Sequence, residues 1–282
     1  SFTCSPKLSA KFLNSPVPII YMSQDKLASV DDTSSSKETV ESKVISNAST
    51  VSDITPQDNS DKLTLIEAVI LEDLDLLQKL LEDPTIDING IDQDCHKTAL
   101  IFAAEYGFDY MVDPLLDAGA DIEAKDNAGN TALIHYAMRG DGAILAKLLE
   151  RGAQVEAKNN EGNTALIYAA MRGDGAILAK LLERGAQVDA KDNAGNTALM
   201  YAANGHEAIV AKLLERGAQA DAKDNAGNTA LMYASLKGHG VVVEKLLAAG
   251  AQVEAKHNAG FTALMCAVAK GHAAVVEKLL AA

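Results

Sequence analysis

Apolar residues recur along this chain at helical spacing, inside a longer repeating pattern. Within residues 164–196, two apolar stripes follow the 3.6-residue period of an α-helix: Leu166, Ala169 and Ala170, then Ile177, Leu178, Leu181 and Leu182. Thr164 and Asp174 precede the stripes, where their side chains cap a helix N-terminus. Gly173 and Gly185 follow them, as glycines do at helix C-termini. The pattern predicts two helices joined by a turn and followed by a polar loop.

The tripeptide Thr-Ala-Leu marks the start of each such unit. It begins at spacings of 33, 33, 33, 32 and 33 residues, at Thr98, Thr131, Thr164, Thr197, Thr229 and Thr262. A weaker copy begins at Thr64. One unit is too small to bury both of its apolar stripes alone, so neighbouring units must stack against one another. The repeat therefore predicts an all-α solenoid.

These units resemble the ankyrin repeat. The shared features are the 33-residue period, the Gly-x-Thr-x-Leu opening, Gly-His-x-x-Ile-Val at 205–210 and Gly-Ala-x-Val-x-Ala-Lys-Asp at 185–192. The resemblance covers about residues 62–282 and implies a curved stack of helix pairs with projecting β-hairpin loops, used as a protein-binding surface. The family's Thr-Pro-Leu-His motif lacks its histidine here. Apolar packing is expected in its place, from Ile134, Ile167, Met200, Met232 and Met265.

The sequence predicts that the chain consists of two parts, a tail and a repeat domain. Residues 1–61 are expected to form a disordered tail, because their Ser/Thr-rich sequence has no periodicity. Residues 62–282 form the repeat domain, with a cap-like repeat at 62–97, full repeats at 98–130, 131–163, 164–196, 197–228 and 229–261, and a partial terminal repeat at 262–282. Repeat 197–228 lacks one residue before Gly205, which leaves Asn204 where its neighbours have Arg or Lys. The last helix has no polar outer face, so the array is expected to continue.

Composition and charge limit the classes of partner and the cellular compartment that we expect for this protein. The formal net charge is −14, which would repel nucleic acid, so none is expected as a partner. Cys4, Cys95 and Cys266 do not form a disulfide framework. No apolar run approaches the ~20 residues of a membrane span, so no membrane partner is expected either. These features predict an intracellular, cytoplasmic protein.

Candidate chemistry is sparse. His206, His239 and His272 share one repeat position, but no cysteine or carboxylate cluster accompanies them, which favours a structural role over a metal site. The Gly-Asp-Gly segments at 140–142 and 173–175 lack the third glycine and the preceding strand of a dinucleotide loop. No nucleophile motif, P-loop or His-Glu-x-x-His occurs. We predict no enzyme activity, no cofactor and no metal.

The first helix of each unit carries the candidate binding residues. Aromatic residues recur at the fourth position after the repeat threonine and basic residues at the eighth, and positions four apart share one helix face. The resemblance places this face in the concave groove. The predicted partner-binding residues are Tyr168, Tyr201, Tyr233, Met138, Met171, Arg139, Arg172, Lys237 and Lys270. Tyrosine and arginine are frequent hot spots, methionine adapts to a partner, and the basic residues imply an acidic partner surface. The alternative is that the tyrosines are core packing and the basic residues solvated helix ends.

The sequence thus predicts a non-catalytic scaffold that binds another protein through this groove. Two alternatives stay open. The chain could be the targeting arm of a longer protein with a catalytic domain beyond residue 282, or a structural spacer without a defined ligand. The spacer is favoured by the nearly identical loop sequence Asn-Ala-Gly-Asn at 127–130, 193–196 and 225–228.

Overall fold

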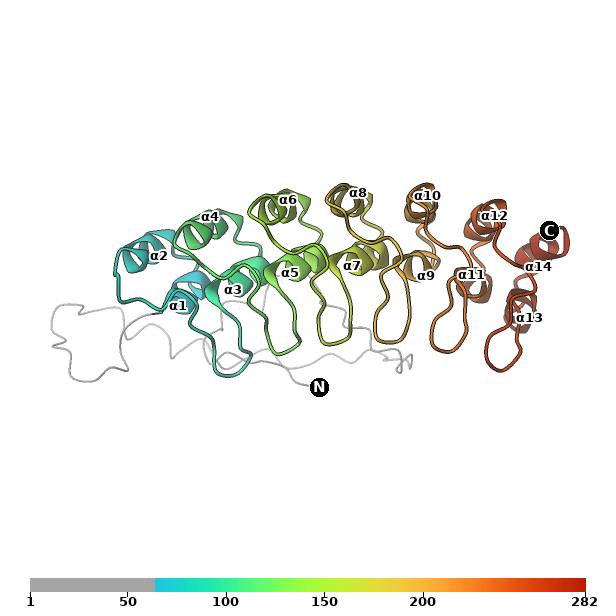
Figure 1. Cartoon of the computed structure of the whole chain (residues 1–282), viewed down its shortest axis with the longest axis horizontal. Coiled ribbons are helices and arrows are strands. Elements are labelled where there is room, and N and C mark those ends of the chain that lie inside the picture. Colours follow the sequence, from blue (N-terminus) through green and yellow to red (C-terminus); the bar gives the residue numbers. More distant parts are fainter. Residues whose placement is uncertain (1–63) are drawn as a thin grey trace, which may run out of the picture. The chain divides into compact units, whose positions relative to one another are not determined.

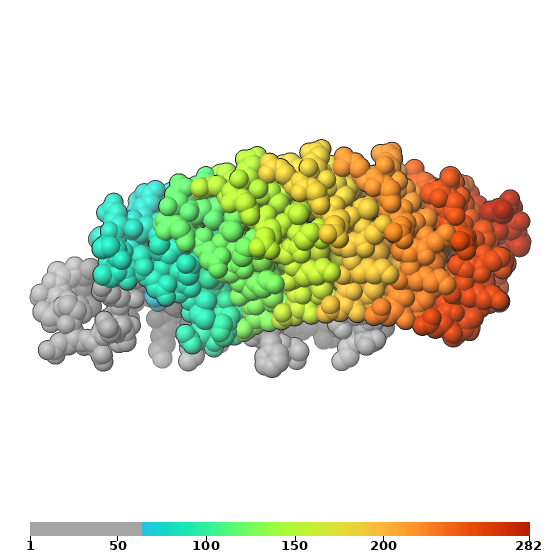
Figure 2. Space-filling view, in the orientation of Figure 1, coloured from blue at the N-terminus to red at the C-terminus, as the bar shows by residue number. Residues whose placement is uncertain are grey.

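A computed structural model describes residues 64–282, so the predicted tail at 1–61 lies outside the described residues. Within residues 64–282 the chain forms fourteen α-helices and no named β-strand. The helices alternate along the chain between two rows, with loops projecting from the stack (Figure 1). The space-filling view shows successive repeats packed side by side into one continuous elongated surface (Figure 2). The predicted all-α solenoid is confirmed.

Each repeat contributes one helix to each row. The first helices are α1 (Leu65–Ile70), α3 (Ala99–Tyr106), α5 (Ala132–Arg139), α7 (Ala165–Arg172), α9 (Ala198–Ala202), α11 (Ala230–Lys237) and α13 (Ala263–Ala269). The second helices are α2 (Leu74–Leu81), α4 (Asp109–Asp117), α6 (Gly142–Glu150), α8 (Gly175–Glu183), α10 (Glu207–Glu215), α12 (Gly240–Ala248) and α14 (Ala273–Leu280). The stack bends into a gentle arc whose outer side carries the second helices (Figure 1).

The repeat threonines start the first helices. Each of them except Thr197 accepts a hydrogen bond from the backbone N–H three residues later, as Thr164 does from Ile167. Glycines in the left-handed region end α3, α5, α7 and α11, for example Gly173 at φ 75°. Helix α9 has only 5 residues, against 8 in α7. The single-residue deletion therefore shortens this helix.

Apolar residues of the first and second helices together form one core that runs through the stack. The expected apolar substitutes for the family's histidine are buried in four repeats, with exposures of 0 to 3% at Ile134, Ile167, Met200 and Met232. Met265 of α13 is 51% exposed, because no following repeat packs on it within the described residues. The expectation of apolar packing is therefore met except at Met265.

The loops project as expected, but β pairing is confined to one isolated antiparallel bridge between Lys191 and Thr197 within residues 64–282. Backbone groups at the loop tips bond both within their own loop and to the neighbouring loop. The Asp126 N–H donates to the Asn130 carbonyl at 3.1 Å in one loop, and the Asn160 N–H donates to the Ala128 carbonyl of the preceding loop at 2.9 Å. Hydrogen bonding between loops therefore adds to the limited pairing within each loop.

Candidate binding surface on the first helices

Stacking leaves few positions of each first helix accessible. In α7, every residue from Ala165 to Ala170 is buried apart from Tyr168, which is half-buried. Met171 is 38% exposed and Arg172 is also exposed. These are the fourth, seventh and eighth positions after the repeat threonine. We call the surface formed by these three positions in successive repeats the first-helix face.

The predicted partner-binding residues all lie on this face. The basic residues at the eighth position are exposed, and the tyrosines at the fourth position are half-buried. Met138 is half-buried. In α5, however, the fourth position is closed, because His135 is only 6% exposed and its Nε2 lies 2.9 Å from Asp126 Oδ2. Asn204 is exposed beside the shortened α9, so the basic row is interrupted there, as the sequence predicted.

The tyrosines of the face use their hydroxyl groups inside the protein. Tyr201 donates a hydrogen bond to Asp192 Oδ2 at 2.6 Å, and Tyr233 donates to Asp224 Oδ2 at 2.7 Å. The Tyr168 hydroxyl accepts a hydrogen bond from Asn159 Nδ2 at 2.9 Å. Each bond ties a first helix to the loop that precedes it. The part of each tyrosine left for a partner is therefore its partly exposed ring.

Burial and these bonds perturb the ionisation of both partners. Burial, followed by the hydrogen bond to Asp192, raises the pKa of Tyr201, and burial and Asp224 do the same to the pKa of Tyr233. Burial opposes ionisation of Asp224, but hydrogen bonds from Asn228, Tyr233 and Ala226 hold its pKa below the usual value of 3.8. The tyrosines stay neutral donors and Asp224 stays an acceptor across the physiological range.

Arg139 is more firmly held than an ordinary charge at a helix end. Its Nη1 donates to the Glu105 carbonyl at 2.9 Å, and its guanidinium covers Gly107, where a Cβ atom would collide with it. Nearby, burial and the neighbouring Asp141 carboxylate raise the pKa of Asp109, and the Arg139 charge opposes this shift. Arg139 is therefore more than a solvated helix end, which was the alternative that the sequence left open. Its side chain links two repeats.

Other basic residues of the face are unpaired. Arg172, Lys237 and Lys270 make no side-chain hydrogen bond or ion pair within residues 64–282. Many cations elsewhere are engaged. In the loops Lys125, Lys158, Lys191 and Lys223 each donate to a carbonyl of the next repeat. On the second helices, cations form ion pairs with the preceding repeat, as Lys147 does with Asp113. Lys79 and Arg216 elsewhere in the described residues are also exposed and unpaired, so the first-helix face is distinguished by cations that lie together with tyrosine rings and methionines.

Asparagines at the loop tips form a ladder along the stack. Each side-chain amide nitrogen donates to a backbone carbonyl of the preceding loop, from Asn127, Asn160, Asn193, Asn225 and Asn258. The donor–acceptor distances are 2.8 to 3.0 Å. The near identity of the loops therefore has a structural cause. Sequence reasoning missed this ladder, although identical residues at one position of adjacent repeats are the signal that a ladder leaves.

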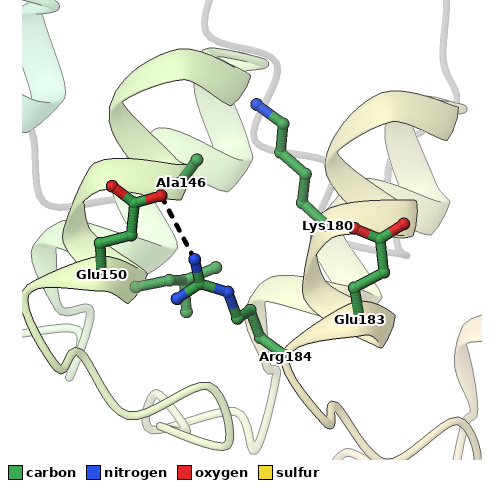
Figure 3. A pocket seen from close by; sticks show the side chains of 6 residues that line it. Ala146, Glu150, Lys180, Glu183 and Arg184 are labelled. Atoms are coloured by element: carbon green, nitrogen blue, oxygen red, sulfur yellow. Dashed lines mark hydrogen bonds and ion pairs between the residues drawn. The ribbon is translucent and has the colours of Figure 1, made fainter.

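A cavity of about 310 Å³ lies between α6 and α8, in the second-helix row (Figure 3). Its lining is charged, but both of its cations are engaged. Lys180 donates to the Gly142 carbonyl at 2.6 Å, and Arg184 pairs with Glu150 at 3.3 Å. These contacts join neighbouring repeats, so the cavity is a groove between packed helices rather than a converging set of free polar groups.

The recurring histidines also join repeats. His206 Nε2 lies 3.0 Å from the Met171 carbonyl oxygen, and its ring covers Gly173. His272 makes the same contact with Leu236, at 3.1 Å. In the part of the chain that the structure describes, His, Cys, Asp and Glu side chains form no cluster suited to a metal ion. None of the helices between residues 64 and 282 is long and apolar enough to cross a membrane.

Comparison with known proteins identifies the repeat. A family model described as ankyrin repeats, in three copies, matches residues 65–159, 138–224 and 210–282. Among solved structures, the chain is similar to the ankyrin repeat domain of Bcl-3, described as a unique member of the IkappaB protein family. The identity is 28%, the match covers 79% of this chain and 99% of that chain, and the TM-score is 0.69. A search of curated proteins gives no match.

Proposed function

This chain belongs to the ankyrin-repeat family, and from that premise we propose that it is a non-catalytic scaffold that binds another protein through the first-helix face. Both the family and the similarity to Bcl-3 support a role in protein interaction. One observation carries the choice of face. Arg172, Lys237 and Lys270 are exposed and unpaired, and accessible tyrosine rings and a methionine accompany them.

The charge of the first-helix face indicates the charge that we expect on the partner's surface. An exposed ion pair contributes only ~0.2 to 1 kcal/mol, so a row of cations adds modest affinity. It contributes more to the association rate and to the rejection of basic partners. The chain as a whole carries a net charge of −14, so a locally basic row favours one docking orientation. We therefore assign the scaffold a protein partner with an acidic surface, and neither a nucleic acid nor a membrane.

The two alternative functions fare differently. The recurring loop sequence favoured a spacer, but the asparagine ladder gives the first asparagine of each loop a structural role that does not depend on that function. As the targeting arm of a longer protein, the chain would use the same face, so the binding proposal holds in that case too. We place the protein in the cytoplasm, since Cys95 and Cys266 are free thiols, as a reducing compartment requires.

The test compares partner capture by matched variants. The face variant carries Arg172→Glu and Lys237→Glu. The control carries Lys79→Glu and Arg216→Glu, which make the same charge change at exposed residues of α2 and at the end of α10. Lysines of the loops are unsuitable controls, because Lys125 and Lys191 bond to the next repeat.

Proteins captured from cell extract are quantified by mass spectrometry at one salt concentration. We expect the face variant to lose specific partners that the control keeps, because charge reversal turns attraction into repulsion. The proposal fails if the two variants capture the same set of proteins. Circular dichroism of both variants verifies that each stays folded.

A further inference from the structure

A pair of identical dipeptides interrupts the otherwise varied first-helix face. Met138–Arg139 and Met171–Arg172 occupy the seventh and eighth positions of adjacent repeats, 33 residues apart. Met138 is half-buried, Met171 is 38% exposed, and both arginines are exposed. We call these four residues the Met-Arg stripe. Each repeat thus offers one apolar contact with one cation directly beside it.

The ends of the stripe are defined by the neighbouring repeats. On one side the seventh position is Glu105, whose carboxylate pairs with Lys97 at 2.7 Å. On the other side α9 is short, Ala203 is buried and Asn204 is uncharged. The stripe therefore covers two repeats and requires a partner segment of matching length.

The spacing of the stripe selects the conformation of the partner. Packed helices lie about 8 to 10 Å apart, so the two dipeptides are separated by about that distance along the stack. An α-helix rises 1.5 Å per residue, and seven residues therefore advance about 10.5 Å and return to the same face. A β-strand covers this distance in about three residues, which places the next side chain on the opposite face. A polyproline helix also keeps its face at this spacing, but exposed methionines are typical of grooves that take an amphipathic helix, so we choose the α-helix and test the alternative with proline peptides.

Arg139 and Arg172 differ in the hydrogen bonds that they already make within the protein. Arg139 is held in place by its bond to the Glu105 carbonyl, which occupies one of the five N–H donors of a guanidinium. Arg172 lies against Gly140 of the preceding repeat but makes no side-chain hydrogen bond within the described residues. Both can therefore receive a carboxylate, and the planar guanidinium favours bidentate pairing.

We propose that the Met-Arg stripe docks an acidic amphipathic helix in which apolar residues recur every seven positions, with Asp or Glu beside them. The inference rests on the proposed function and narrows it, since it specifies the secondary structure and the residue spacing of the partner segment. The apolar residues contact Met138 and Met171, and the carboxylates pair with Arg139 and Arg172.

The experiment uses synthetic 21-residue peptides and the full chain, with binding followed by fluorescence anisotropy. One set carries Leu, Ile, Met or Phe at every seventh position with Glu beside it. A second set has the same composition in an order that breaks the spacing, and a third carries prolines that prevent a helix. We expect the best peptide of the first set to bind at least about tenfold more tightly than the others. Arg172→Glu and Met171→Ala should each weaken it several-fold, and Arg216→Glu should not.

Three results would overturn the inference: no binding by the first set, equal binding by the reordered or proline peptides, or equal weakening by Arg216→Glu. These outcomes are separable from failure of the proposed function. If the Arg172→Glu, Lys237→Glu variant still loses its cellular partners while the peptides fail, the first-helix face binds a partner of another shape. If that variant loses none, the proposed function itself is wrong.

Discussion

Replacing Tyr233 with Phe separates the two roles that a tyrosine on the first-helix face can have. The change keeps the ring for a partner and removes the hydroxyl that donates to Asp224 Oδ2 at 2.7 Å. A hydrogen bond to a charged group contributes about 1.5 to 3 kcal/mol. The contact with Asn196 Oδ1 at 3.3 Å adds little, because a phenol has one proton to donate. Asp224 also keeps its bonds from Asn228, so we expect a loss at the lower end, about 1.5 kcal/mol.

The stability that Tyr233→Phe loses should be larger at neutral pH than at acidic pH. The pKa of Asp224 is lowered in the folded protein, in part by Tyr233. A lowered carboxyl pKa stabilises the fold above the ordinary value of 3.8, and this contribution disappears as the pH falls through the folded pKa. The difference in unfolding free energy between wild type and Tyr233→Phe should therefore be full at pH 7 and shrink near pH 3.

Urea denaturation followed by far-UV circular dichroism measures this difference, with the m-value expected to stay constant. Asn160→Ala is the control, since its side-chain amide donates to the neutral carbonyl of Asn127. A neutral bond contributes about 0.5 to 1.5 kcal/mol, and this loss should be similar at both pH values. If Tyr233→Phe costs nothing, or costs the same at pH 3 as at pH 7, the hydroxyl does not hold the Asp224 carboxylate. Retained partner binding by Tyr233→Phe, with loss in Tyr233→Ala, would assign the ring to the partner.

Other substitutions test the contacts between repeats by the same denaturation assay. Tyr136→Ala should lower the free energy of unfolding by about 3 to 5 kcal/mol, because this ring is fully buried. A loss below ~1 kcal/mol would mean that the site collapses around the smaller residue. Asn160→Ala removes one hydrogen bond of the loop ladder and should lower the free energy of unfolding by about 0.5 to 1.5 kcal/mol. An unchanged denaturation midpoint would mean that the ladder does not stabilise the fold. Arg139→Glu should destabilise more than Arg172→Glu, which should stay within ~0.5 kcal/mol, and equal effects would contradict the linking role of Arg139.

Most of the architecture is predictable from local pattern. The period, the threonine caps and the glycine stops place a helix pair in each repeat, and the 32-residue spacing marks the repeat in which α9 is shortened. These features are predictable because each depends on residues within one turn of the helix that they start or stop. The loss of the cap bond at Thr197 was not predicted, although it lies in the same repeat as the deletion.

The geometry of the proposed binding face is predictable from the sequence only in part. Helical spacing places the basic and aromatic positions on one face, and their exposure agrees with that placement. Helical spacing alone does not reveal that Arg139 bonds to a carbonyl 34 residues earlier, or that His135 turns inward to Asp126. Such contacts depend on how far each repeat is translated and rotated against the next, and that geometry is a property of the stack rather than of one helix.

The distribution of variation among the repeats indicates where a partner would be discriminated. The loop asparagines repeat because each must reach the carbonyl of its neighbour, so their identity is determined by the ladder. On the first-helix face Arg139 bonds to the preceding repeat, but the exposed side chains of Met171 and Arg172 make no such bond and give way to Leu236 and Lys237 two repeats later. Substitution there costs the fold little and changes what a partner contacts. We therefore expect partner specificity on the first-helix face, while the loops hold the stack in the register that spaces its side chains.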